Sequence, residues 1–240
     1  MSDLRTPVLR ASSALATLPG GLLWGAVALG WIDPLLASRV MATCVFIGLS
    51  GVILAPWLSV GDRDASTRAR LIDLLVVWTA ASAGAQLLWE LPFALLHPWL
   101  VGVTAEDTWA WLFWAYGNAD SRYLIADPFV VCMEGFTSAV GGPLELYALW
   151  LVRKGRMVDA ARLAVLLGAT QWYGAVLYFG IEVFEGLPHI HTGNLIDFGI
   201  KFFALNAFWL VMPILQVWAG MKVIANPSVL RDIAPAAAPA

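Results

Sequence analysis

The sequence has few charged residues and few cysteines, and both shortages narrow the class of protein. Only 13% of its 240 residues are Asp, Glu, Lys or Arg, whereas ordinary soluble domains hold roughly 25%. The two cysteines, Cys44 and Cys132, lie in apolar runs, where we expect buried thiols. A disulfide framework or a zinc site would need more cysteines at a recognisable spacing. The 14 Lys and Arg residues do not outnumber the 17 Asp and Glu residues, so there is no basic footprint for nucleic acid.

Short motifs of cofactor-dependent and metal-dependent enzymes are also missing. The chain has no HExxH pattern, no glycine-rich dinucleotide motif, no Walker A loop and no GxSxG elbow. The histidines of the HIH run at 189–191 do not make a metal site by themselves. We therefore expect neither a cofactor nor a metal.

Apolar residues dominate the composition. Hydrophobic residues make up 60% of the chain, mean hydropathy is +0.75, and 13 tryptophans are present. Tryptophan gathers at membrane–water interfaces, and about 20 apolar residues span a bilayer as a helix. The pattern predicts an all-α, multi-pass transmembrane bundle. Its six predicted spans cover residues 13–32, 40–60, 71–97, 128–152, 158–181 and 196–221.

Lysine and arginine are distributed unevenly between the predicted loops. The connections at 61–70 and 153–156 are basic, whereas 98–125 has only Arg122 and 182–195 has none. Cytoplasmic loops carry the excess of positive charge, so both termini are predicted to be cytoplasmic. The membrane would be the endoplasmic reticulum in a eukaryote or the inner membrane in a bacterium, and membrane lipid would surround the bundle.

Two glutamates lie inside predicted spans. Glu90 is four residues after Gln86 on the same helix face and precedes Pro92, which should kink the helix. Glu134 lies about 10 Å along its helix, with Thr137 on the same face. A carboxylate at membrane depth is costly, and its usual explanation is functional. The structural alternative is a polar pair that holds two helices together.

Other polar residues in the spans have less decisive interpretations. Glu145 follows a helix break at 141–143 and is a candidate partner for Lys201 or a capping group. Lys201 is also four residues after Asp197, so these two can neutralise each other. Asp127 is expected to cap the fourth span.

The last two spans carry three further candidates. Asn206 and Trp209 share one face of the sixth span, and Pro213 frees the carbonyl of Trp209. They are either helix–helix contacts or ligands for a cation, because an indole face attracts positive charge. Tyr178, in the fifth span, is a candidate for packing or for a binding pocket.

Several motifs in one order resemble the emopamil-binding-protein family, the EXPERA-domain membrane proteins that include the sterol delta-8 to delta-7 isomerase. The resemblance covers 71–217 and implies a five-helix bundle with a cavity open toward the membrane, to which 13–32 adds an extra helix. Residues 1–70 would then form two N-terminal spans and a basic loop, and 218–240 a disordered cytoplasmic tail. The motifs are YGNADSRYLIAD (116–127), VCMEGFT (131–137), GGPLELY (141–147), QWYGAVLYF (171–179) and NAFWLVMP (206–213).

The resemblance implies roles for the candidate residues. Carboxylates at the positions of Glu90 and Glu134 would protonate and deprotonate the sterol ring. Thr137, Asn206 and Trp209 would line the site, the last two near a cationic centre. The predicted substrate-binding residues also include Gln86 and Tyr178.

This chain departs from the family pattern at three positions. Gln86 stands where the isomerase has a histidine, Ala175 replaces an aspartate, and Glu145 replaces a small polar residue. A histidine exchanges protons near neutral pH and a glutamine amide does not. One proton-handling group is therefore lost and a carboxylate is gained.

The function expected from these features is a cofactor-independent isomerase that shifts a ring double bond in a sterol or related polycyclic terpenoid. The mechanism would be protonation, carbocation formation and deprotonation. The alternatives are a non-catalytic protein of the same fold that binds sterols or amphiphilic amines, and a related carbocation cyclase. Expected partners are the lipophilic substrate and membrane lipid, and a homodimer is left open.

Overall fold

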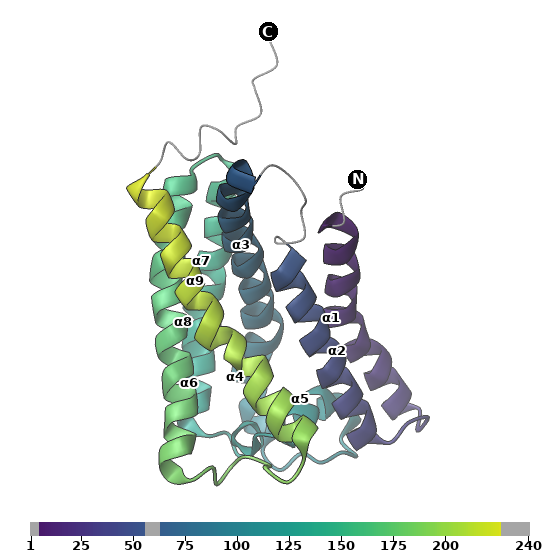
Figure 1. Ribbon diagram of the computed structural model, residues 1–240. Coiled ribbons are helices and arrows are strands. Elements are labelled where there is room, and N and C mark those ends of the chain that lie inside the picture. The colour runs from purple at the N-terminus through teal and green to yellow at the C-terminus, as the bar shows by residue number, and fades with distance from the viewer. Residues whose placement is uncertain (1–4, 56–62, 227–240) are drawn as a thin grey trace.

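The computed structural model describes residues 5–55 and 63–226, and within these ranges every regular element is a helix (Figure 1). The predicted all-α class is confirmed. In chain order the elements, with π-helices and 3₁₀ turns marked η, are α1 (Arg5–Ala28), α2 (Pro34–Leu54), α3 (Arg63–Ala85), η2 (Gln86–Glu90), α4 (Leu91–Leu100), η3 (Thr108–Ala110), α5 (Trp111–Gly117), η4 (Ser121–Tyr123), α6 (Pro128–Phe136), η5 (Thr137–Gly141), α7 (Gly142–Arg153), α8 (Met157–Glu185), η6 (Ile196–Ala204) and α9 (Leu205–Ala225).

Five helical runs are long and apolar enough to cross a membrane: α1, α2, α3 through α4, α8, and η6 with α9. A further run, α6–η5–α7, is continuous over the fourth predicted span but carries Glu134 and Glu145. The start of α1 and the end of α9 lie at the same end of the bundle (Figure 1).

The second helix starts earlier than predicted because a capping residue sets its boundary. The second span begins at Pro34, not at 40, since the carboxylate of Asp33 accepts a hydrogen bond from the Leu36 amide at 2.8 Å. Arg39 therefore lies within α2. Asp127 caps α6 as predicted, with its carboxylate 3.0 Å from the Val130 amide.

Three predicted irregular segments are partly helical. In the basic loop expected at 61–70, α3 has already begun at Arg63. In the tail expected from 218, α9 continues to Ala225, and the part at 227–240 lies outside the described residues. The long connection expected at 98–125 contains the short helix α5.

Three π-helical segments interrupt the long helices. In η2 the Leu91 amide bonds to the Gln86 carbonyl, five residues back, directly before Pro92. In η5 the Gly142 amide bonds to the Thr137 carbonyl in the same way. The predicted breaks at Pro92 and at 141–143 are therefore wider helical turns, a form that recurs at functional sites. The third, η6, ends two residues before Asn206.

Buried charges tie α2 to the last crossing. Lys201 donates to Asp197 at 2.7 Å and to Ser38 at 2.9 Å, and Arg39 reaches the same aspartate at 2.7 Å. The predicted pairing of Asp197 with Lys201 is confirmed, and the suggested partnership of Glu145 with Lys201 was wrong. The contact of Arg39 with Asp197 was not predicted, because 158 residues separate the two.

Cysteine burial differs from the expectation. Cys44 is half-buried and Cys132 is exposed on the side of α6, and both are free thiols. Cysteine fits a lipid-facing position as well as a core position. The apolar residues around each cysteine therefore did not show whether its thiol is buried or faces lipid.

The N-terminal hairpin depends on a close approach of α1 to α2. A Cβ atom at Gly48 would lie 2.5 Å from the Ala16 backbone nitrogen and 2.7 Å from the Ser12 carbonyl oxygen. Glycine lets two backbones meet in a membrane bundle, where small residues drive helix association.

We expect Gly48→Ala to lower the stability of the protein by about 1–3 kcal/mol, because the added methyl group forces α1 away from α2. The matched control is Gly25→Ala in α1, where nothing lies within 4 Å of the new methyl group. Thermal unfolding in lipid nanodiscs, followed by tryptophan fluorescence, measures both. Equal melting temperatures for the two variants would contradict the close approach.

Candidate functional site

Two carboxyl groups meet inside the bundle. Glu90, at the end of η2, and Glu134, in α6, are 8% and 5% exposed. The two side chains lie close enough to interact electrostatically with each other. Two adjacent carboxylates repel each other in an apolar environment, and one shared proton relieves that repulsion. The pair predicted from the sequence is therefore assembled from two separate helices.

Each carboxyl group also has its own hydroxyl donor. The Thr137 hydroxyl donates to Glu90, and the Tyr123 hydroxyl donates to Glu134. Burial raises the pKa of Tyr123, and the charge of Glu134 raises this pKa further, so the phenol remains protonated and donates. Tyr123 was missed by the sequence reading because it lies in a loop, although the YGNADSRY motif contains it.

Tyrosines connect this pair to the last helix. The Asn206 amide donates to the Tyr116 hydroxyl at 2.7 Å and to the Phe202 carbonyl at 2.6 Å. The Tyr116 ring packs edge-on against Tyr123, with 4.8 Å between centroids. Burial is also the main reason that the pKa of Tyr116 is raised. Asn206 and Glu134 thus lie on either side of one aromatic contact.

Trp209 forms another aromatic contact, three residues further along α9. It is half-buried and meets the buried Trp78 edge-on at 5.3 Å between centroids. Trp78 is fixed by the hydrogen bond that its indole donates to Gln171 at 3.2 Å. Two indole rings therefore accompany Asn206, in keeping with a site for a cationic group.

The remaining predicted residues, Gln86 and Tyr178, have other partners. Gln86 is buried one turn before Glu90, and its amide donates to Ser82 at 3.4 Å; within the described chain no bond joins it to Glu90. The Tyr178 hydroxyl donates to Asp120, so it belongs to a neighbouring ionic network.

That ionic network closes the end of the bundle opposite the Arg153–Arg156 turn. Arg122 donates to Asp120 at 2.6 Å, lies 3.3 Å from Glu182, and sits over the Tyr178 ring at 4.1 Å from its centroid. His189 contacts the same glutamate at 2.8 Å. The sequence reading missed this network because its members come from two loops and α8. It positions the η4 turn from which Tyr123 reaches Glu134.

Glu182, Glu185 and His189 have the spacing of metal ligands, with ligand atoms within 4.8 Å of one another. Glu182 is already engaged by Arg122, whose charge opposes a cation at that position. These residues therefore fit an ion-pair network better than a metal centre.

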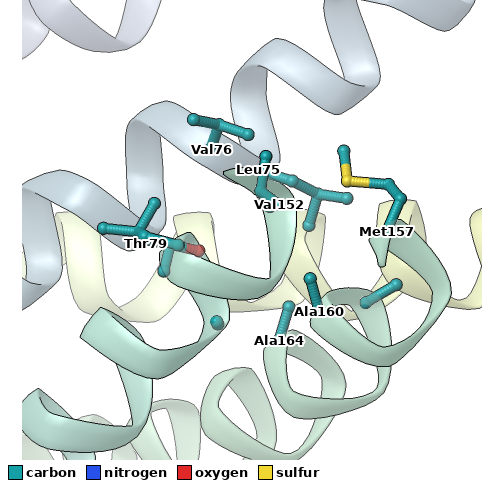
Figure 2. Close-up of a pocket in the computed structure, with 10 residues that line it drawn as sticks. Leu75, Val76, Thr79, Val152, Met157, Ala160 and Ala164 are labelled. Carbon is teal, nitrogen blue, oxygen red and sulfur yellow. The ribbon is translucent and has the colours of Figure 1, made fainter. Parts of the chain in front are cut away.

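A separate cavity of about 20 Å³ lies between α3, α7 and α8. It includes neither Glu90 nor Glu134, and Thr79 supplies the polar side chain of its wall. Figure 2 shows Thr79 and Met157 at opposite ends of the labelled group. The lining residues are Leu75, Val76, Thr79, Ala148, Leu149, Val152, Met157, Ala160, Ala161 and Ala164. This cavity has no group for acid–base chemistry.

The fold and the site together define an integral membrane helical bundle with a buried pair of carboxyl groups beside aromatic and amide groups. The family model described as EXPERA, the expanded EBP superfamily, matches residues 108–219. The chain is 31% identical over 214 residues to the mouse 3-beta-hydroxysteroid-Delta(8),Delta(7)-isomerase, covering 84% of this chain and 88% of the mouse protein. The chain belongs to this family, as the motifs predicted.

Plant relatives extend the comparison. A probable 3-beta-hydroxysteroid-Delta(8),Delta(7)-isomerase of Arabidopsis thaliana is 25% identical over 83% of this chain and 86% of its own length. A protoglabretal synthase of Ailanthus altissima is 26% identical over 75% of this chain and 80% of its own length. A relative named as an isomerase and a relative named as a synthase thus both match across most of the chain.

We expect Arg122→Met to destabilise the protein by about 3–5 kcal/mol, because it leaves Asp120 and Glu182 buried without their counter-charge. Arg162→Met is the matched control, since Arg162 is 65% exposed and pairs with Asp159 at the surface. Melting temperature and the yield of monodisperse protein in detergent report the difference. Identical melting curves for the two variants would show that the network does not hold the loops.

Proposed function

We propose that the protein is a cofactor-independent membrane isomerase that shifts a ring double bond in a sterol or a related polycyclic terpenoid. The observation that carries the proposal is the contact between Glu90 and Glu134 inside an apolar bundle. The mouse relative's name, a Delta(8),Delta(7)-isomerase, supports the reaction class. A lipophilic substrate reaches such a site from the surrounding bilayer.

The reaction needs one proton donor and one proton acceptor. The protonated carboxyl of the pair gives its proton to one carbon of the ring double bond, forming a C–H bond and a carbocation on the other carbon. The second carboxylate removes a proton from the carbon next to the cation, and those electrons form the shifted double bond. The pair ends with one proton, as it began, but on the other carboxyl.

The hydroxyl donors support this exchange. Thr137 stabilises negative charge on Glu90, and Tyr123 stabilises it on Glu134. Each carboxylate therefore has a hydrogen bond waiting when it loses its proton. The protonated phenol of Tyr123 is suited to this role because burial keeps it a donor.

The cation forms between the pair and α9 in this scheme. Trp209 offers an indole ring to positive charge, and Asn206 is held by Tyr116 and the Phe202 carbonyl. We assign Gln86 to the wall of the same site, one helical turn from Glu90. Tyr178 supports the site indirectly, because its hydroxyl contacts the Tyr116 hydroxyl at 3.2 Å and fixes that side chain.

Residues 71–217 are the proposed catalytic unit, and 1–70 an N-terminal addition that α2 ties to Asp197 through Arg39. Both termini would face the cytoplasm, in the endoplasmic reticulum of a eukaryote or the inner membrane of a bacterium. The excess of Lys and Arg at the end of the bundle that holds the Arg153–Arg156 turn supports this orientation.

One observation favours a second candidate, a sterol-binding or amine-binding protein without turnover. Gln86 stands where the resembling isomerase has a histidine, and its amide is bound to Ser82. An amide does not titrate, so it supplies no proton.

We expect Glu134→Gln and Glu90→Gln each to reduce turnover by about 10²–10⁴-fold, because either change removes one half of the acid–base pair. Glu185→Gln, on the exposed end of α8, is the matched control and should retain turnover. The assay uses reconstituted protein with a delta-8 sterol in D₂O and detects the shifted double bond by NMR and mass spectrometry. Sterol binding without any shifted product in the unmodified protein would favour the binding function.

Gln86→His tests the missing histidine. If the sterol is the native substrate and the carboxyl pair is sufficient, the substitution should change turnover of a delta-8 sterol less than threefold. The same assay measures it, with Gln86→Glu as a second titratable substitution. A gain of a hundredfold or more would mean that the native substrate is another terpenoid.

A further inference from the structure

A stripe of polar side chains runs along one face of the third crossing. Thr79, Ser82, Gln86 and Glu90 are spaced by three, four and four residues, the repeat of a single helix face. They are 4%, 0%, 1% and 8% exposed. Polar residues at membrane depth are rare and line bundle interiors or substrate and ion pathways. Glu90 is the last of the four, so the stripe ends at the carboxyl pair.

Neighbouring helices supply a polar partner at successive levels of this stripe. Gln216, from α9, donates to Thr79 at 3.4 Å. Gln171, from α8, donates to Ser82 at 2.8 Å and also to Glu145 of α7. The interior between four helices is therefore polar from Thr79 to Glu90.

Acceptor oxygens along the stripe exceed the donors available. Gln86 Oε1, Glu145 Oε2 and Gln216 Oε1 are buried and have no hydrogen-bond partner among the described residues. A Cβ atom at Gly141 would lie 2.7 Å from Gln86 Oε1, so the glycine leaves this oxygen room. Glu145 is one turn after Gly141 on the same face of the chain. Buried acceptors of this kind are normally satisfied by water or by a proton.

The cavity described above begins where the stripe begins. Thr79 forms one end of it, and Met157, the first residue of α8, lies at the other end (Figure 2). Its volume of about 20 Å³ exceeds the roughly 10–15 Å³ that one water molecule needs. Met157 follows the basic turn of Arg153–Arg156, so the cavity extends toward the polar end of the bundle.

We propose that the Thr79–Glu90 stripe, with Glu145 at its middle, is the route by which protons exchange between the basic end of the bundle and the carboxyl pair. The inference rests on the proposed function, in which the pair gives up one proton and takes back another in each cycle. A proton passes directly between the two adjacent carboxyls to reset the pair, and the stripe lets that proton exchange with water: one proton enters from the cavity end through Glu145 to Glu90, and one leaves along the same path. No net proton is consumed.

Glu145 is the titratable group that this route requires. Its Oε1 accepts from Gln171, and its Oε2 is free to carry or release a proton. Ser82, bonded to Gln171 and to Gln86, joins the Glu145 level to the Gln86 level. Ser82 and Glu145 are positioning and relay residues, distinct from the carboxyl pair that acts on the substrate.

The test measures hydrogen–deuterium exchange of the buried carboxyl groups by infrared spectroscopy, without any sterol. The carbonyl band of the pair is identified by its loss in Glu90→Gln and Glu134→Gln. We expect Ser82→Ala and Glu145→Gln to slow its exchange at least tenfold, whereas Ser82→Thr restores the rate. Ser50→Ala is the matched control, because the bond that this hydroxyl makes within the described part of the chain goes to the Phe46 carbonyl of its own helix, α2.

A second measurement follows turnover of a delta-8 sterol in D₂O. The product from the unmodified protein should carry solvent deuterium, and the deuterated fraction should fall at least threefold in Ser82→Ala and Glu145→Gln, with sterol affinity unchanged. Unaltered carboxyl exchange in both variants would overturn the route. If the protein turns over no sterol but the variants still slow exchange, the route stands and the proposed isomerase function fails.

Discussion

Two carboxyl groups that lie together inside a membrane bundle are the constraint on which the rest of the structure depends. Neither Glu90 nor Glu134 is stable there alone, because a buried carboxylate without donors is strongly disfavoured. Thr137 and Tyr123 meet this requirement from different segments. Tyr123 in turn needs the η4 turn, which Arg122 ties to Asp120 and Glu182. The ionic network at the loop end therefore supports the chemistry of the pair without touching it.

The π-helical segments explain how ordinary helices bring the pair together. Glu90 ends η2 and Thr137 begins η5, so both bonded residues lie at a widened turn. A π turn shifts the helical phase of the residues beyond it, which aims a side chain differently from its neighbours on the same face. Proline at positions 92 and 143 favours such turns because it has no amide hydrogen. The regular α-helical hydrogen bonding is therefore interrupted at the place where the two glutamates meet.

The sequence sufficed for features that depend on neighbours in the chain. The all-helical class, the cap at Asp127, the Asp197–Lys201 pair and the burial of both glutamates follow from periodicity, capping and i,i+4 spacing. Tyr123 and Arg122 could not be placed, because loops bring them to partners on other helices. Arg39 was missed for the same reason, since its aspartate is 158 residues away. Long-range contacts, rather than local propensity, decide those positions.

Gln86 and Glu145 are best understood together. Judged by the resembling isomerases, the chain loses a histidine at one position and gains a carboxylate at another. The structure puts Gln86 and Glu145 on adjacent helices, with Ser82 and Gln171 linking their levels through hydrogen bonds of 3.4 and 2.8 Å. Glu145 therefore gives the polar stripe a titratable group at the level next to Gln86. In this arrangement an amide beside Glu90 is compatible with proton exchange, because the exchanging group can be Glu145.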